Sequence, residues 1–526
     1  MKVNLHLHYN KAFQWYVNDT IFLKGYFFYE NNFYEKENAL LFLSKITSLK
    51  DLLKKINGVF TILKKENNKM VVINDITRSF PIFYTKIDSF WSISDDIDFL
   101  KSKLKTLEFN KVSENEFLAS NHVHGSKTLL ENIYQTQSSE YISFTENDIE
   151  ERFFYFSYSC EKQDKINLEK LSKDGLTVFE NSFERTIHSC NNRQVVIPLS
   201  SGFDSRLIAV FFKKHNYKNV LCYTYGKKNS FEIEYSKKTS QALNFKWIFI
   251  EYDEKLTGEF LKTDNFIKYS DYAAKGVSMP NLQEYFAVKY LTDNKIIDDD
   301  AIFIPGYAGD ILGGSEYKYF KKINFKTTTL EEIIFNFKMI NKKFFTLEKE
   351  ITLREIKSNL KAFDKDYSKK IPETVLDDYN LKERIAKYIF NSASFYTFFG
   401  HEFRFPFWDL ELLSFFKTLP INLKEENSFF NDFLKKQYFE PFQVAFENKV
   451  VSKKNNFKII KTYIKAFLPK FIKQKRLEKR DWNNYKLITK PMYLTLKKNG
   501  LKISRTYKDY NEIITQWYLL KMRNKL

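Results

Sequence analysis

The stretch Pro-Leu-Ser-Ser-Gly-Phe-Asp-Ser-Arg, residues 198–206, decides the fold. It follows the apolar residues 195–199, which are typical of a short buried strand, and it leads into residues 205–215, whose apolar spacing predicts a helix. A helix that begins here exposes unpaired backbone N–H groups, and small residues let an anion approach them closely. The pattern predicts a phosphate-binding loop, although a serine-rich helix cap without a ligand has the same appearance.

Asp204 adds a requirement to this loop, because a carboxylate repels a bare phosphate. A Mg²⁺ ion between the carboxylate and the phosphates removes the conflict. The loop lacks both the G-x-x-x-x-G-K-[ST] and the G-x-G-x-x-G patterns, so neither of those nucleotide-binding loops is present. We therefore expect a metal–nucleotide site formed by Ser200, Ser201, Gly202, Asp204 and Ser205.

A second glycine-rich loop, residues 305–314, has the sequence Pro-Gly-Tyr-Ala-Gly-Asp-Ile-Leu-Gly-Gly and follows the apolar residues 301–304. The whole chain has only 14 glycines, so this cluster indicates tight backbone turns around a ligand. Open α/β sheets bind ligands at the carboxyl ends of their strands, where Asp310 could give a second carboxylate to the same metal. A glycine-rich turn with an exposed Asp310 is the alternative interpretation.

The segments between these loops predict the fold class. Residues 220–225 and 246–252 have the pattern of buried strands, and residues 232–243 have that of a helix. Alternation of this kind predicts an α/β domain, a parallel sheet with helices on both faces, over residues 168–449. Residues 1–158 are strand-rich and predict a separate α+β domain, and residues 450–526 predict a helical extension.

The extension carries most of the charge of the chain. Residues 450–526 contain 21 Lys and Arg against 4 Asp and Glu, a difference of +17 in a total formal charge of +19. Such a surface can attract an anionic partner, for example nucleic acid, anionic lipid or an acidic glycan. A solvated pair of basic helices with no fixed partner is the simpler interpretation.

The composition restricts the remaining classes. A chain of 526 residues with 43% hydrophobic and 28% charged residues is typical of a packed protein of several domains. No apolar run reaches the roughly 18 residues of a membrane-spanning helix. The three cysteines, Cys160, Cys190 and Cys222, form neither a disulfide framework nor a zinc pattern, so we expect a cytoplasmic protein.

Several motifs carry a resemblance to a known family. Residues 200–205 resemble the S-G-G-x-D-S loop of the PP-loop superfamily, with Ser201 in place of the first glycine. Residues 402–409, Glu-Phe-Arg-Phe-Pro-Phe-Trp-Asp, resemble the E-x-R-x-P-F-x-D motif of asparagine synthetases, and Leu419-Pro420 with Lys424 resembles the L-P-x-x-x-K that follows it. With residues 305–314, these motifs resemble in order the synthetase domain of asparagine synthetases and of β-lactam synthetase.

The resemblance implies an ATP-dependent, Mg²⁺-dependent ligase that adenylates a carboxylate, releases pyrophosphate and lets an amine or ammonia form an amide. It implies a small-molecule or glycan carboxylate as the substrate. It also implies Tyr307 and Arg404 as catalytic residues, Asp204 and Asp310 as metal ligands, and a nucleotide site that includes Leu199, Thr224, Tyr225 and Gly306.

Two positions depart from the family's pattern, and a third resembles one of its acidic residues. Tyr307 replaces the glutamate of asparagine synthetases and resembles β-lactam synthetase, where a tyrosine needs a partner to act as a base. Phe429 or a neighbour occupies the place of a phosphate-binding lysine, for which Lys435 or Lys436 could substitute. Glu234 resembles the family's acidic residue near the start of the second helix.

The first domain has a likeness of its own. Residues 57–62, 74–84 and 92–96 resemble motifs of class II glutaminase domains. Those enzymes use a cysteine directly after the initiator Met, where this chain has Lys2. We expect a degenerate domain without glutaminase activity, so that the amine comes from outside. The pairs His6/His8 and His122/His124 are expected to be structural or exposed.

Two other functions stay open. A PP-loop enzyme that acts on tRNA would explain the basic extension. A nucleotide-binding pseudo-enzyme without turnover would explain the missing cysteine and lysine.

Overall fold

A parallel sheet forms the centre of the computed structural model, which describes residues 3–162, 167–320, 323–339, 347–446, 470–501 and 509–523. Its strand order is β14-β13-β12-β15-β16, and all four pairings are parallel. The strands are β12 (Val195–Pro198), β13 (Val220–Gly226), β14 (Lys246–Glu251), β15 (Ile302–Phe303) and β16 (Glu402–Phe403). The chain order reverses between β12 and β15, which is where open α/β sheets form a ligand crevice.

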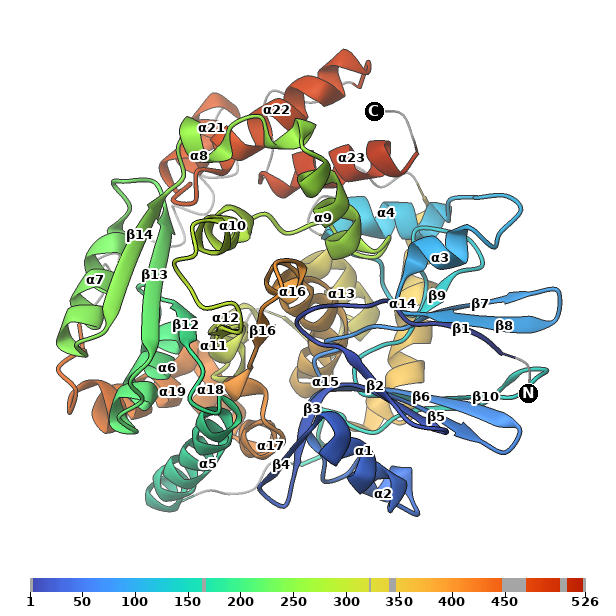
Figure 1. The fold of residues 1–526 in the computed structure, drawn as a ribbon, viewed down its shortest axis with the longest axis horizontal. Coiled ribbons are helices and arrows are strands. Elements are labelled where there is room, and N and C mark those ends of the chain that lie inside the picture. Colours follow the sequence, from blue (N-terminus) through green and yellow to red (C-terminus); the bar gives the residue numbers. More distant parts are fainter. Residues whose placement is uncertain are drawn as a thin grey trace.

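Helices cover both faces of this sheet, which confirms the predicted fold class. Helices α6 (Phe203–Lys214) and α7 (Phe231–Ala242) lie on one face, and α10 (Tyr285–Asp293) lies on the other (Figure 1). The buried side of α6 is the apolar run from Leu207 to Phe212 that the sequence pattern indicated. The predicted strands and helices of this region agree with the observed ones to within about two residues.

The strand-rich N-terminal part contains two stacked sheets. The smaller has the order β1-β8-β7-β9, with β1 (Val3–His6), β8 (Phe90–Ser94), β7 (Phe83–Ile87) and β9 (Tyr134–Gln135). The larger has the order β11-β10-β6-β5-β3-β2, with β4 (Asn32–Glu35) paired to β3. Its other strands are β11 (Ile149–Phe154), β10 (Glu140–Phe144), β6 (Lys69–Asn74), β5 (Asn57–Glu66), β3 (Ile21–Tyr29) and β2 (Trp15–Val17).

Alternating apolar residues hold these two sheets together. Leu63, Val72 and Ile142 of the larger sheet share one buried cluster with Ile82 and Ile93 beside the smaller one. Helices α1 (Lys36–Ser44) and α2 (Leu49–Leu52) cover the opposite face of the larger sheet. The N-terminal part is therefore a layered unit, placed to the right in Figure 1.

The two parts share one hydrophobic core. Phe13 and Val59 of the N-terminal part belong to the same buried cluster as Val196 and Phe303 of the parallel sheet. The rings of Phe13 and Phe403 pack edge to face with centroids 5.2 Å apart. The junction is thus a packed interface, which fixes the N-terminal part against the end of the parallel sheet.

Helices dominate the rest of the chain, as predicted from residue 327 onward. They include α5 (Leu168–Ser189), α13 (Leu330–Lys338), α14 (Lys349–Phe363), α15 (Pro372–Asn380), η4 (Leu381–Ile389), η5 (Phe390–Ala393), α16 (Ser394–Phe398), α17 (Leu410–Thr418) and α19 (Ser428–Leu434). Among the described residues, none of the helices combines the length and the apolar character needed to cross a membrane.

Part of the basic extension is described. Its helices are α21 (Lys470–Lys479), α22 (Tyr485–Lys498) and α23 (Asn511–Met522). Helices α22 and α23 bury Ile488, Met492 and Trp517 in the main core. Residues 450–469, 502–508 and 524–526 lie outside the described residues, so the anionic partner expected for this extension stays a prediction.

Candidate functional site

The two glycine-rich loops meet at the carboxyl ends of β12 and β15. The backbone N–H of Asp310 donates a hydrogen bond of 3.0 Å to the carboxylate of Asp204. A methyl group on Gly309 would lie 2.8 Å from Asp204 Cγ, and one on Gly306 would lie 2.9 Å from Ser205 N. Both glycines are therefore required for this close approach, and the structure brings the two predicted metal ligands together.

The electrostatics of the pair fit a cation. Burial raises the pKa of Asp204 well above its usual range, and the neighbouring Asp310 carboxylate raises it further. A divalent cation between the two carboxylates would counter both effects, and carboxylate oxygens are the ligands that Mg²⁺ favours. Asp204 is half-buried and Asp310 is exposed, so the pair is open to a ligand from solvent.

The hydroxyl groups of two serines stabilise the first loop by accepting hydrogen bonds from its own backbone. Ser205 Oγ accepts a 3.0 Å hydrogen bond from Ser200 N, and Ser200 Oγ accepts one of 3.1 Å from Gly202 N. The backbone N–H of Ser201 donates to the carboxylate of Glu232. Ser201 avoids the left-handed region, so a serine at the family's glycine position brings no backbone strain.

Arg206 stabilises the first loop through hydrogen bonds from its buried side chain. Its guanidinium is fully buried and donates to Ser201 O at 2.9 Å and to Val444 O at 2.8 Å. Burial lowers the pKa of Arg206 to about 10, which leaves it charged at neutral pH. The contact connects the loop to the end of the helical region near residue 444.

A cavity of about 310 Å³ opens beside the two loops. The predicted residues that line it are Leu199, Ser200, Gly202, Asp204, Ser205, Thr224, Tyr225, Gly306 and Tyr307. Thr224 Oγ1 donates to Leu199 O at 2.7 Å and accepts from Trp247 Nε1 at 3.0 Å, which fixes the strand end. Ser201 and Asp310 lie in the two loops but are not among the lining residues.

Sequence reasoning missed three contributors to this cavity. Trp482 and Asn483, far along the chain, line it because Trp482 O accepts a hydrogen bond of 2.8 Å from Lys227 N. Glu232 lines it in place of Glu234, which is exposed and pairs with Lys238 at 2.7 Å. Glu232, two residues before Glu234 on the same helix, therefore faces the first loop. The prediction that Glu234 is the family's acidic residue was wrong by about half a helical turn.

A buried tyrosine–glutamate cluster forms the back wall and is the third contributor. Glu284 accepts hydrogen bonds from Tyr223 Oη at 2.5 Å and from Tyr396 Oη at 2.8 Å. Tyr307 Oη donates to Tyr396 Oη at 3.5 Å, so the cluster reaches the tyrosine of the second loop. Burial raises the pKa of Glu284 to about 7, although the tyrosine hydrogen bonds lower it. No sequence motif pointed to Glu284, because its partners Tyr223 and Tyr396 lie 61 and 112 residues away along the chain.

Arg404 occupies a different place from the one the resemblance implied. Its guanidinium donates to Glu402 and to Ser189 Oγ, each at 2.9 Å, and lies 4.2 Å from the centre of the Tyr26 ring. It is fully buried and is not among the residues that line the cavity. The structure makes Arg404 a support of the domain junction, and we no longer place it among the groups that could act on a substrate.

The position of the family's lysine is apolar here. The ring of Phe430 packs on Gly313, where an added methyl group would lie 2.7 Å from the ring. Lys435 is half-buried, Lys436 is exposed, and neither lines the cavity. Lys424 is fully buried, and its backbone lies against Gly314 at the end of the second loop. Its ammonium lies 5.1 Å from the centre of the Tyr158 ring, and Lys424 is not among the residues that line the cavity.

The two histidine pairs have different environments. His122 and His124 are buried, their rings stack with centroids 4.6 Å apart, and His124 shares a 2.9 Å hydrogen bond with Tyr379 Oη. His6 and His8 are exposed near Asp96. Each pair lies with a carboxylate, Asp96 or Glu383, whose ligand-type atom is within 4.8 Å of those of the histidines. A structural or exposed role for the pairs stays a prediction.

Comparisons with known proteins give a broad relationship. No family model matches the chain. The chain is 21% identical over 272 residues to the microcin J25-processing protein McjC of Escherichia coli, a match that covers 50% of this chain and 48% of that protein. The matched region thus spans about half the length of this relative.

Two solved structures are similar at low scores. An NH3-dependent NAD synthetase from Campylobacter jejuni aligns with 15% identity and a TM-score of 0.21, covering 39% of this chain and 96% of that one. An NMN synthetase from Francisella tularensis aligns with 16% identity and a TM-score of 0.20, covering 41% and 92%. The alignments with these two structures are too weak to assign a class, and the comparisons establish no family for this chain.

Proposed function

We propose that this protein is an ATP-dependent ligase that activates a carboxylate as an acyl-adenylate and then forms an amide. The observation that carries the proposal is the meeting of Asp204 and Asp310 beside a loop with a helix N-terminus, at the edge of a cavity. The similarity to a microcin-processing protein supports an activity on a peptide or small-molecule carboxylate. The substrate and the nitrogen donor are to be found by experiment.

In the first step, an oxygen of the substrate carboxylate attacks the α-phosphorus of ATP, and the bond between the α-phosphorus and the bridging oxygen breaks. Asp204 and Asp310 would hold a Mg²⁺ ion, which neutralises charge on the departing pyrophosphate. The first turn of α6, which begins at Phe203, would offer its backbone N–H groups to the phosphates, and Leu199, Thr224 and Tyr225 would enclose the adenosine. Trp482 and Asn483 restrict the entry of water.

In the second step, an amine attacks the acyl carbon, and AMP leaves with the electrons of the acyl–oxygen bond. The amine loses a proton, for which Glu284 is the best-placed acceptor through Tyr396 and Tyr307. Its pKa of about 7, which burial raises, suits proton exchange near neutral pH. Glu284 is the partner that the tyrosine of the second loop requires.

We further propose that the amine comes from outside. The three cysteines of the chain are all buried and free, so none is placed as an exposed nucleophile for glutamine. Incubation with glutamine is expected to release no glutamate above the rate of an Asp204→Asn variant. Stoichiometric glutamate would contradict this part of the proposal.

ATP–pyrophosphate exchange across a panel of carboxylic acids tests the main proposal. Asp204→Asn is expected to lower exchange by about 100-fold or more, because the metal loses a charged ligand. Glu234→Gln is the matched control, since Glu234 is exposed and outside the cavity. Equal exchange in the wild type and in Asp204→Asn would overturn the proposal.

A second candidate function is nucleotide binding without turnover, because Phe429 or a neighbour stands where the resemblance places a phosphate-binding lysine. In that case calorimetry would show Mg²⁺-dependent ATP binding that is lost in Asp204→Asn, while no acid supports exchange. An action on tRNA remains a prediction from the basic extension, and tRNA binding that falls steeply with salt would support it.

A further inference from the structure

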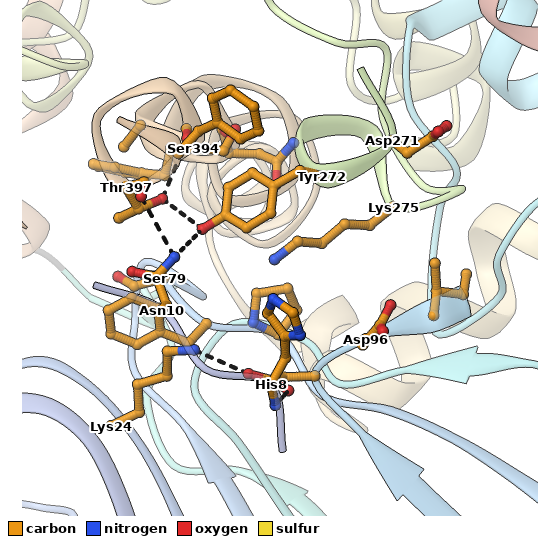
Figure 2. Close-up of a pocket in the computed structure, with 18 of the residues that line it drawn as sticks. His8, Asn10, Lys24, Ser79, Asp96, Asp271, Tyr272, Lys275, Ser394 and Thr397 are labelled. Carbon is orange, nitrogen blue, oxygen red and sulfur yellow. Dashed lines mark hydrogen bonds and ion pairs between the residues drawn. The ribbon is translucent and has the colours of Figure 1, made fainter. Parts of the chain in front are cut away.

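A larger cavity, of about 410 Å³, lies at the junction of the two parts of the molecule, apart from the nucleotide-type site. Its walls come from the end of β1, the start of α3 (Ile97–Lys101), the helix α9 (Asp264–Ala274) and the segment of η5 and α16 (Figure 2). Apolar side chains form much of the wall: Phe80, Pro81, Ile97, Phe390, Phe398 and Phe403. A cavity of this size accommodates a small organic ligand.

Most polar groups in this cavity already have partners. Asn10 Nδ2 donates to Tyr272 Oη at 2.7 Å, and Tyr272 Oη shares a 2.8 Å hydrogen bond with Thr397 Oγ1 (Figure 2). Lys24 Nζ pairs with Asp95 at 2.9 Å. These groups satisfy one another, so a ligand has little to gain from them.

Lys275 is different. Its side chain extends into the cavity (Figure 2), and within the described parts of the chain its ammonium makes neither a hydrogen bond nor an ion pair. Its one contact is with the ring of Tyr272, whose centre lies 5.3 Å from Nζ. Burial lowers the pKa of Lys275 to about 8, and the nearby Lys24 lowers it too, while Asp95 and Asp96 act in the opposite direction. A half-buried ammonium without an anion is costly unless a ligand supplies one.

The acidic groups at the rim do not supply that anion. Asp98 pairs with Lys101 at 2.6 Å and Asp271 pairs with Lys521 at 2.5 Å. Asp96 accepts a 2.9 Å hydrogen bond from Asp98 N at the start of α3. The inner part of the cavity therefore combines apolar walls, the Lys24–Asp95 ion pair and the ammonium of Lys275, which has no ion pair among the described residues.

We propose that the cavity at the junction binds the carboxylate of a small apolar acid, with Lys275 as its counter-ion. The carboxylate pairs with Lys275 Nζ, and the apolar body of the acid lies against Phe80, Phe390 and Phe398. An amino-acid derivative and a simple aliphatic acid share this chemistry. The site is separate from the loop cavity, so the proposal goes beyond adenylation and stands without it.

Calorimetry on the full chain without ATP tests the site. The probes are N-acetyl-L-leucine and 4-methylpentanoate, each compared with its neutral amide. Each acid is expected to bind about tenfold more tightly than its amide, because only the acid forms the charged pair. Tighter binding of N-acetyl-L-leucine would point to an aminoacyl ligand, and tighter binding of 4-methylpentanoate to an acyl ligand. Equal affinity of acid and amide, or no binding of either acid at millimolar concentration, would overturn the proposal.

Variants test whether Lys275 is the residue that causes the preference for the acid. Lys275→Gln is expected to remove the preference for the acid, while Lys275→Arg keeps most of it. Lys268→Gln is the matched control, because Lys268 lies on α9, which ends directly before Lys275, and it lines the cavity but is exposed. Asp204→Asn should bind the acids normally, which separates this site from the loop cavity. A preference for the acid that persists in Lys275→Gln and disappears in Asp204→Asn would refute the assignment.

Discussion

The loop cavity and the junction cavity are built in opposite ways. Beside the loop cavity two carboxylates lie close together, Asp204 and Asp310, whereas in the junction cavity the ammonium of Lys275 has no ion pair among the described residues. The first is assembled mainly from two continuous motifs at the ends of neighbouring strands. The second is assembled from residues of several segments that lie far apart in the sequence. The comparison teaches that both sites contain charged groups without a full set of partners, although only the loop cavity has a sequence motif.

The largest effect is expected at the junction itself, where loss of Asp409 should damage one cavity and spare the other. Asp409 accepts two hydrogen bonds from Arg185, at 2.8 and 2.7 Å, and a third from Asn57 across the interface. Asp409→Ala leaves Arg185 mostly buried with only Glu411 as an ionic partner, and should lower the free energy of unfolding by about 3 kcal/mol. Chemical denaturation measures this, with Glu411→Gln as the milder control.

The same variant sharpens the comparison between the sites. Acid binding at the junction cavity is expected to weaken in Asp409→Ala, while Mg²⁺-dependent ATP binding at the loop cavity stays within about twofold. If ATP binding falls as much as acid binding, the two cavities are not independent structures.

Glu284 gives the next largest effect, on the pH dependence of stability. Burial raises its pKa from 4.5 to about 7, so the folded state favours the protonated form. This contribution to stability is complete below pH 4.5 and is lost as the pH rises through 7. It amounts to about 3 kcal/mol, since one pKa unit corresponds to about 1.4 kcal/mol.

Glu284→Gln should therefore remove part of the pH dependence. From pH 4.5 to pH 8 the wild type is expected to lose about 3 kcal/mol more than this variant, as measured by urea denaturation. Glu234→Gln, whose side chain is exposed, should follow the wild type. Parallel curves for the wild type and Glu284→Gln would show that Glu284 is not held protonated in the folded protein.

A smaller effect is expected from the glycine that lets the carboxylates approach. Gly309→Ala places a methyl group 2.8 Å from Asp204 Cγ and should displace that side chain by a few tenths of an ångström. Mg²⁺-dependent ATP binding is expected to weaken about tenfold. Gly202→Ala is the control in the other loop, since its methyl group would meet only Ser200 Oγ at 3.2 Å.

The loop cavity shows how far sequence reasoning extends. The apolar periodicity around β12 to β14 and the two glycine-rich loops are local signals, and they predicted the sheet and the meeting of Asp204 with Asp310. Glu284 and Trp482 carry no local signal, because their place depends on how distant segments pack. Arg404 shows the opposite case, in which a motif was present but its side chain supports the junction.

The junction cavity was not predictable for the same physical reason. Lys275 follows α9 as an ordinary basic residue in a chain with many lysines, and nothing in the sequence places it beside Asn10 or Phe390. Its isolation from partners is a property of tertiary packing. A sequence pattern can indicate a residue type and its spacing, but it cannot indicate an ammonium that lacks a counter-ion.

The segment of η5 and α16 lines the junction cavity and also reaches Glu284, which lines the loop cavity. Tyr396 points to Glu284 behind the loop cavity, while the next residue, Thr397, and Phe390 line the junction cavity. A ligand in the junction cavity and a ligand in the loop cavity would therefore both act on the position of this short stretch of backbone. By thermodynamic reciprocity, if a ligand in the junction cavity changes the affinity for ATP by some factor, ATP changes the affinity for that ligand by the same factor.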